Sequence, residues 1–329
     1  MKKTIKTVLG LLMVTGLAMV AQAATIPEGM GILPNNVPVP ANNPMSAAKI
    51  SLGTQLYFDP ALSASGQFSC NSCHNLGTGG VDNQKTSIGH HWQRGGRNAP
   101  TVLNAAFWSK QFWDGRAPLL EDQAKGPPLN PVEMASADAD TVVARLKTAG
   151  YAPLFTTVFG KNALTYDNMA KAIAAFERTL ITPNAPFDRF VQGTGDISKA
   201  AKRGMVKVAE VGCTSCHSGA LFTNNEFVEF AYGSDTGLKS ITGKADDDHV
   251  FRVQSWRNVA LTAPYFHDGS ASTLAQAVKI MAKVQLQTTL SDADVNDIVA
   301  FLTTLTGDQP QITFPTLPRP TGVSLDWQD

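Results

Sequence analysis

Two short segments of the chain share one pattern, Cys-x-x-Cys followed at once by histidine. They read FSCNSCHN at residues 68–75 and VGCTSCHS at residues 211–218. Together they use all four cysteines of the chain and place one histidine directly behind each pair: Cys70, Cys73, His74, Cys213, Cys216 and His217. The repetition predicts that the histidine is part of the chemistry and that the same group is held twice.

Three cysteine chemistries compete for this spacing. A thioredoxin-type redox pair needs no adjacent histidine, and a zinc site or a pair of disulfides would leave both histidines without a role. Cys-x-x-Cys-His is the attachment signature of a c-type haem, in which the thiols form thioethers and the histidine lies under the iron. The two motifs therefore predict two covalently bound c-type haems, with His74 and His217 as proximal ligands.

The second axial position of each iron decides between electron transfer and catalysis, because an open position lets a small molecule react. Met281, 64 residues after His217, suits a sixth ligand, although a methionine in a helical core is the alternative. His90 lies 16 residues after His74 in the glycine-flanked segment SIGHHWQRGG. It could be a removable ligand or a solvated loop histidine, and composition alone does not separate the two.

The first 23 residues have the pattern of a secretory signal peptide, with Lys2, Lys3 and Lys6 before an apolar run and Ala21-Gln22-Ala23 at the end. The chain has 27 basic and 27 acidic side chains, so removal of three lysines leaves 24 basic ones and a net charge of −3. That balance does not indicate a nucleic-acid partner. We expect an exported protein with no membrane span.

The elements that must position these residues are predicted to be helices. Apolar residues recur at helical spacing within residues 43–59, 137–150, 165–180, 196–217 and 291–307, with Asp196 and Ser291 as expected caps and Gly307 as a stop. No stretch alternates convincingly over the length of a strand. The fold class is mainly α, with long loops and two cytochrome c-like domains, each around one haem. The expected divisions are a signal peptide at 1–23, domains at 24–185 and 186–306, and a C-terminal arm at 307–329.

Beyond the two motifs, longer segments resemble the bacterial dihaem cytochrome c peroxidases over nearly all of the mature chain. These segments are SLGTQLYFDP, FSCNSCHNLGTGG, GHHWQRGGRNAPTVLNA, QFWDGRA, GPPLNPVEM, GCTSCHSG, FRVQSWRNVALTAPYFHDGS and AVKIMAKVQL. They stand in the order and spacing of that family.

The resemblance implies a role for each candidate residue. His74 would hold a low-potential haem where hydrogen peroxide reacts, with His90 as its removable ligand and Glu133 as the catalytic acid and base. His91 stands where many members have a small residue. His217 and Met281 would hold a high-potential haem, and Trp113 would lie between the two haems. One calcium ion at the domain interface would take oxygen ligands from Asn98, Thr262 and Pro264.

The same resemblance implies a periplasmic peroxidase that reduces hydrogen peroxide to water. Its electrons would come singly from a small soluble donor, a cytochrome c or a copper protein, and the chain would form a homodimer. Reduction of the high-potential haem is expected to release His90 and open the peroxide site. The alternative is a dihaem electron-transfer cytochrome without peroxide chemistry. A third reading, a relative that oxidises a protein or a quinol, is disfavoured by Met281.

Overall fold

Helices make up almost all of the regular structure of the chain. The computed structural model describes residues 25–320, 322, 324, 325 and 327, so the expected signal peptide lies outside the described residues. The helices are α1 (Ala47–Phe58), α2 (Cys70–Cys73), α3 (Leu120–Gln123), α4 (Gly126–Leu129), α5 (Ala139–Thr148), α6 (Ala152–Phe159), α7 (Tyr166–Glu177), α8 (Pro186–Val191), α9 (Lys199–Glu210), α10 (Lys239–Thr242), α11 (Leu274–Gln285) and α12 (Asp292–Thr303). The mainly α prediction is confirmed, with one addition: two three-residue strands, β1 (Phe227–Glu229) and β2 (Val250–Arg252), pair antiparallel.

The longer helices begin where a side-chain oxygen accepts a hydrogen bond from the first turn. This holds for α1, α5, α7, α9, α11 and α12, whose caps are Ser46, Asp138, Thr165, Ser198, Thr273 and Ser291. Such a cap typically contributes about 1 kcal/mol. Ser291 is the predicted cap, whereas α9 is capped by Ser198 and not by Asp196, because the Ser198 hydroxyl reaches the amide of Ala201 at 3.1 Å.

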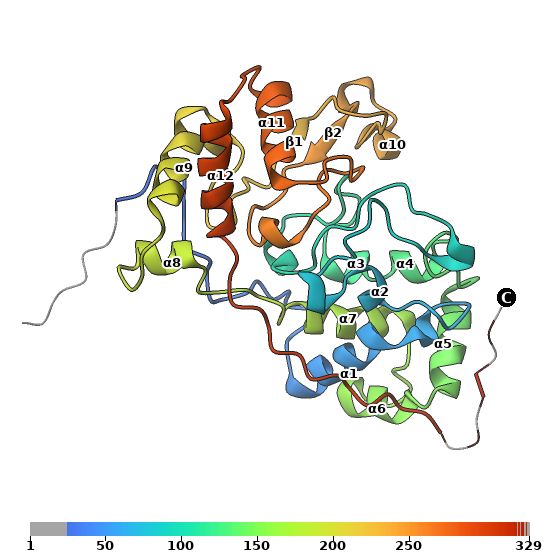
Figure 1. Ribbon diagram of the computed structural model, residues 1–329. Helices are drawn as coiled ribbons and strands as arrows, with labels where there is room; N and C mark the ends of the chain where they lie inside the picture. The colour runs from blue at the N-terminus through green and yellow to red at the C-terminus, as the bar shows by residue number, and fades with distance from the viewer. Residues whose placement is uncertain (1–24, 321, 323, 326, 328–329) are drawn as a thin grey trace, which may run out of the picture.

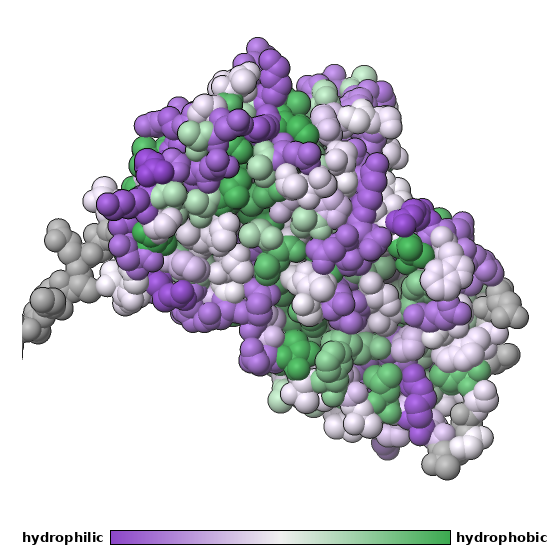
Figure 2. Space-filling view, in the orientation of Figure 1, coloured by the Kyte–Doolittle hydropathy of each residue, from purple (hydrophilic) through white to green (hydrophobic). Residues whose placement is uncertain are grey.

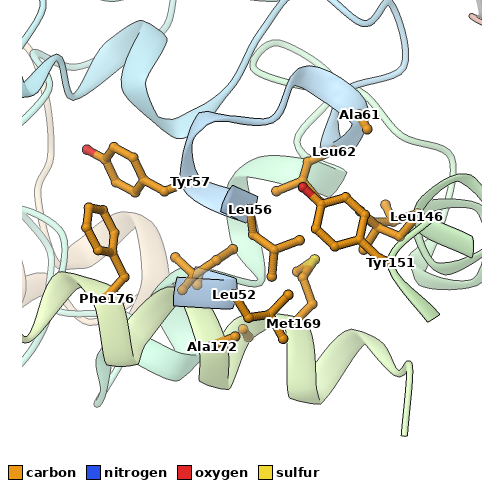
Figure 3. Close-up of a cluster of buried hydrophobic side chains, with 14 of the residues drawn as sticks. Leu52, Leu56, Tyr57, Ala61, Leu62, Leu146, Tyr151, Met169, Ala172 and Phe176 are labelled. Atoms are coloured by element: carbon orange, nitrogen blue, oxygen red, sulfur yellow. The ribbon is translucent and has the colours of Figure 1, made fainter. Parts of the chain in front are cut away.

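The first half of the chain is built on the crossing of α1 and α7 (Figure 1). Figure 3 shows side chains of both helices meeting in one apolar cluster, together with residues of the chain between them: Leu52, Leu56, Tyr57, Leu62, Leu146, Tyr151, Met169, Ala172 and Phe176. The helices approach so closely at Gly53 that an added Cβ would lie 1.9 Å from the carbonyl oxygen of Ala172. Only a residue without a side chain fits there.

The second half repeats this arrangement with α9 and α12, which lie side by side in Figure 1. A Cβ on Gly204 of α9 would lie 1.9 Å from the carbonyl oxygen of Asp297 on α12. Phe187, Phe222 and Phe301 pack edge to face in the core behind these helices. Each half therefore has its own pair of tightly crossed helices and its own buried core.

The ends of the described chain each pack on the opposite half. Near the start, Met30 bridges to Gly219 and the carbonyl of Gly31 accepts a hydrogen bond from Arg257 at 2.8 Å. The C-terminal arm runs below α1 and α6 in Figure 1, and Arg319 pairs with the buried Asp59. The boundary near residue 185 stays a prediction, but residues 26–31 lie on the core of the second half and not of the first.

The surface carries no membrane-spanning feature in the part of the chain that the structure describes. None of the helices there is long and apolar enough to cross a bilayer. Figure 2 shows hydrophilic and intermediate residues over most of one face, with hydrophobic residues between them. Trp92 and Phe314 are the most exposed of the large apolar residues.

Candidate functional site

The first Cys-x-x-Cys-His motif forms a turn of helix that presents His74 to a cavity. Cys70–Cys73 is the whole of α2, and the amide of His74 donates to the carbonyl of Cys70 at 2.9 Å. The His74 ring is oriented from behind, because Nδ1 donates to the carbonyl of Pro100 at 3.0 Å. Burial lowers the pKa of His74, so the ring is neutral and its other nitrogen is free to bind a metal.

The second motif positions His217 in the same way. The His217 Nδ1 atom donates to the carbonyl of Phe222 at 3.2 Å, and the ring stacks on Trp256 with centroids 4.4 Å apart. Burial lowers the pKa of His217 to about 4, which keeps the imidazole neutral at any ordinary pH. A hydrogen bond on Nδ1 that leaves Nε2 free is the usual arrangement of a metal-ligating histidine.

The four cysteines are unpaired, and all are partly exposed. Burial raises the pKa of Cys73 and of Cys213 to about 11, so both remain thiols near neutral pH. Neither a disulfide nor a thiolate zinc site is present among the described residues, and no cluster of three or more His, Cys, Asp or Glu side chains there could hold a metal. Free thiols beside an oriented neutral histidine fit a covalently attached haem.

We call the cavity behind the second motif the His217 cavity; its empty volume is about 1260 Å³, including space open to solvent. His217, Cys213 and Cys216 line it together with Met281, which α11 supplies. The structure therefore brings the two predicted axial ligands of the second haem to one cavity. Its wall is otherwise largely apolar, as a porphyrin face requires.

We call the cavity behind the first motif the His74 cavity; its empty volume is about 1320 Å³, counted in the same way. Cys73 and His74 line it, and so does Glu133. The Glu133 carboxylate accepts a hydrogen bond from Asn130 Nδ2 at 2.9 Å. Burial raises the pKa of Glu133 in spite of the nearby Arg116, so this carboxyl group is poised to exchange a proton nearer neutral pH than an exposed one.

His90 is close to Glu133 but does not line the His74 cavity. Its backbone amide donates to the carbonyl of Glu133 at 2.9 Å, and its ring lies against that of His91 with centroids 3.9 Å apart. The His90 ring is buried, and Nδ1 has no hydrogen-bond partner. His91 and Trp92 both adopt positive φ, of 54° and 60°, so the segment is held in a conformation that such residues rarely adopt.

Trp113 lines both cavities. Its Nε1 atom donates to the carbonyl of Asn98 at 2.9 Å, and its ring lies edge to face against His267, which also lines the His217 cavity. Trp113 therefore contributes to the walls of both cavities, and its place between two haems stays a prediction. Its role in electron transfer is a proposal.

The three predicted calcium ligands lie near the same junction. The Asn98 carbonyl is engaged by Trp113, and the Asn98 amide group donates to the carbonyl of Gln84 at 2.8 Å. Thr262 and Pro264 flank Ala263, whose carbonyl accepts a hydrogen bond from Asn83 at 2.9 Å. Asn98, Thr262 and Pro264 each carry neutral oxygens, which are of the kind that Ca²⁺ binds.

Several charged cavity residues were given no role by the sequence, although some of them lie in segments that carry the family resemblance. Arg97 pairs with Asp114 at 2.5 Å and with Asp235 at 2.6 Å, which ties the two halves together beside the His74 cavity. Glu177 is buried in the wall of that cavity. Arg252 belongs to the wall of the other. Charged residues are usually at the surface, so the burial of these residues becomes visible only in the tertiary structure.

Comparison with known proteins places the chain among relatives of one family. A family model described as di-haem cytochrome c peroxidase matches residues 47–196. The chain is 45% identical to the cytochrome c551 peroxidase of Nitrosomonas europaea, over 85% of this chain and 86% of that protein. It is 43% identical to the cytochrome c551 peroxidase of Pseudomonas aeruginosa, over 88% of this chain and 87% of that protein. Among solved structures, a MauG-like protein associated with microbial copper homeostasis superposes with a TM-score of 0.76 at 28% identity, covering 86% of this chain and 95% of that one.

Proposed function

Because this chain belongs to the di-haem cytochrome c peroxidase family, we propose that it reduces hydrogen peroxide to water at the His74 cavity. The observation that carries this proposal is Glu133, a carboxyl group with a raised pKa in the wall that also holds His74 and Cys73. The residues of both cavities fit two c-type haems. When bound, these haems supply the two electrons that cleavage of the peroxide bond consumes.

The chain contributes proton transfer to this reaction. Peroxide entering the His74 cavity loses a proton from one oxygen to the Glu133 carboxylate. The carboxyl group then returns that proton to the other oxygen, which leaves as water when the oxygen–oxygen bond breaks. With two protons from solvent and two electrons, the oxygen that stays behind becomes the second water molecule. Acid–base help of this kind typically accelerates a reaction by about 10²–10⁴.

Two electrons are needed but each haem conveniently holds one, which is a reason for two differently ligated sites. His217 and Met281 would hold the second haem and would give it the higher potential, since axial ligands and their surroundings move haem potentials over about 0.8 V. Trp113, which lines both cavities, lies on the route between them. The donor is a small soluble cytochrome c or copper protein of the periplasm.

Activation is part of the proposal. Reduction of the haem that His217 and Met281 would hold would release His90 from the haem that His74 would hold, and would free the space beside Glu133. The lining of the His74 cavity, which includes Glu133 but not His90, supports a carboxyl group that stays in the site while the histidine moves. A calcium ion near Asn98, Thr262 and Pro264 would hold the junction of the two halves in this arrangement. The protein is expected to work as a homodimer.

The test is peroxide turnover by Glu133→Gln in protein that carries both haems. Loss of the carboxylate is expected to lower kcat/KM for peroxide about 10²–10⁴-fold, with unchanged haem content and visible spectra. Glu210→Gln, at an exposed position on α9, is the matched control and should keep full activity. Normal turnover by Glu133→Gln would remove Glu133 from the mechanism. Absence of turnover in the wild type, in every redox state, would favour the electron-transfer cytochrome.

A further inference from the structure

The two cavities differ in the charges that their walls carry. Apart from histidines, Arg252 is the one charged side chain among the described residues that line the His217 cavity. The His74 cavity instead has two arginines and three acidic residues: Arg97, Asp114, Arg116, Glu133 and Glu177. The side chains of the His217 cavity therefore supply one positive charge and no carboxylate to balance it. Charges of both signs surround the His74 cavity.

Arg252 is buried without a carboxylate partner. Its side chain is 1% exposed, Nη2 donates to the Gln254 side chain at 3.0 Å, and the guanidinium lies 4.3 Å from the Trp108 ring. The Nε atom has no hydrogen-bond partner. Although burial lowers the pKa of Arg252 to about 9, the group remains charged at neutral pH.

A second buried arginine in the same half of the chain has a carboxylate partner that balances its charge. Arg257 is 2% exposed, and its guanidinium donates to the buried carboxylate of Asp188 at 2.9 Å. A buried charge without a partner costs several kcal/mol. Asp188 offsets this cost at Arg257, but no carboxylate of the described residues offsets it at Arg252. This difference indicates that the uncompensated positive charge of Arg252 has a function of its own.

We propose that Arg252 is a positioning residue that raises the reduction potential of the haem held by His217 and Met281. The inference rests on the proposed function, because it requires that haem. A nearby positive charge favours the reduced iron, which carries one positive charge fewer than the oxidised iron. In a buried environment this effect is screened far less than in water. Since a protonated guanidinium has no lone pair to offer iron, Arg252 acts through its charge and not as a ligand.

The position of Arg252 suits this role. Its backbone amide donates to the carbonyl of Trp113 at 2.9 Å, so the charge is fixed to the residue that lines both cavities. Trp108, on which the guanidinium lies, belongs to the wall of the His74 cavity. There the acidic residues oppose the field of Arg252. The charge therefore widens the gap between the two haem potentials in the direction that sends electrons to the His217 haem first.

The experiment is a spectroelectrochemical titration of both haems in the purified two-haem protein. Arg252→Gln should make reduction of the Met281-ligated haem about ten-fold less favourable, which is 59 mV for one electron. Arg252→Lys keeps the charge and should retain most of the potential. Gln254→Glu keeps the arginine but places a carboxylate on it, and should lower the same potential. Arg203→Gln, which removes an exposed arginine paired with Asp297, is the control and should change nothing.

The outcomes separate this inference from the function on which it rests. It is overturned if Arg252→Gln leaves the potential unchanged, if Arg252→Lys lowers it equally, or if the His74 haem shifts as much as the other. If Arg252→Gln does not fold, Gln254→Glu carries the test. The drop in potential caused by Gln254→Glu should be smaller in an Arg252→Lys background, because lysine does not reproduce the pairing of the guanidinium with residue 254. An equal drop in both backgrounds would show that Arg252 does not set the potential. A chain that takes up no haem would refute the proposed function as well.

Discussion

Glu177 makes the stability of the protein depend on pH in an unusual direction. It is 4% exposed in the wall of the His74 cavity, and Oε2 has no hydrogen-bond partner. Burial, with a smaller contribution from Glu121, raises its pKa from 4.5 to about 8, against the opposing effect of Arg178. Arg178 itself donates to Glu121 at 2.9 Å, so its charge is already balanced. Tyr57 and Cys70 are the other titratable groups that feel this carboxyl group.

The sign follows from the protons bound in each state. Between the ordinary pKa of 4.5 and the folded value of about 8, the folded protein keeps the proton of Glu177 and the unfolded chain loses it. Stability from this group is therefore complete at low pH and is lost as pH rises through that interval. At about 1.4 kcal/mol for each pKa unit, the full effect is about 5 kcal/mol.

The assay compares Glu177→Gln with wild type by denaturant unfolding of the two-haem protein at about pH 4 and about pH 9. Glutamine cannot lose a proton, so the free energy of unfolding of the variant relative to wild type should increase by several kcal/mol between the two pH values. Glu210→Gln provides the same chemical change at an exposed position and should show no such trend. A difference that stays flat, or that falls with pH, would refute the reasoning about Glu177.

Three further predictions follow from the same structure. His90→Gly should remove the need to pre-reduce the enzyme before peroxide turnover, as measured by stopped flow; an unchanged requirement would exclude His90 as the gate. Gly53→Ala should destabilise the protein by about 1–3 kcal/mol or more through overpacking against Ala172, whereas Gly96→Ala, where a Cβ meets nothing within 4 Å, should leave the melting temperature unchanged. Arg319→Ala should leave the buried Asp59 without its cationic partner. Loss of a fully buried pair costs about 3–5 kcal/mol, and the cost is smaller here because Arg319 is partly exposed. The arm at residues 307–320 should then be cleaved faster by a protease, and cleavage as slow as in wild type would contradict this.

The sequence by itself determined the local chemistry of this protein. The two Cys-x-x-Cys-His motifs specify a covalent attachment whose geometry is set within five consecutive residues, so no knowledge of the fold is needed to expect it. The Ser291 cap and the longer helices other than α11 could likewise be predicted, because periodicity and capping act over one or two turns. Met281 was a candidate ligand from its position after His217, and the family resemblance added Glu133 and Trp113. All three residues lie in cavity walls.

Only the tertiary structure decided which distant residues share a cavity and which buried charges are balanced. Glu177 and Arg178 are adjacent in sequence, yet Arg178 pairs with Glu121 and Glu177 faces the His74 cavity alone. Nothing in the sequence distinguishes Arg252 from Arg257, yet only Arg257 forms an ion pair, with Asp188. Desolvation and pairing depend on every neighbour that folding brings within a few ångströms. No pattern of spacing encodes those neighbours, so the electrostatics of the two sites belong to the fold.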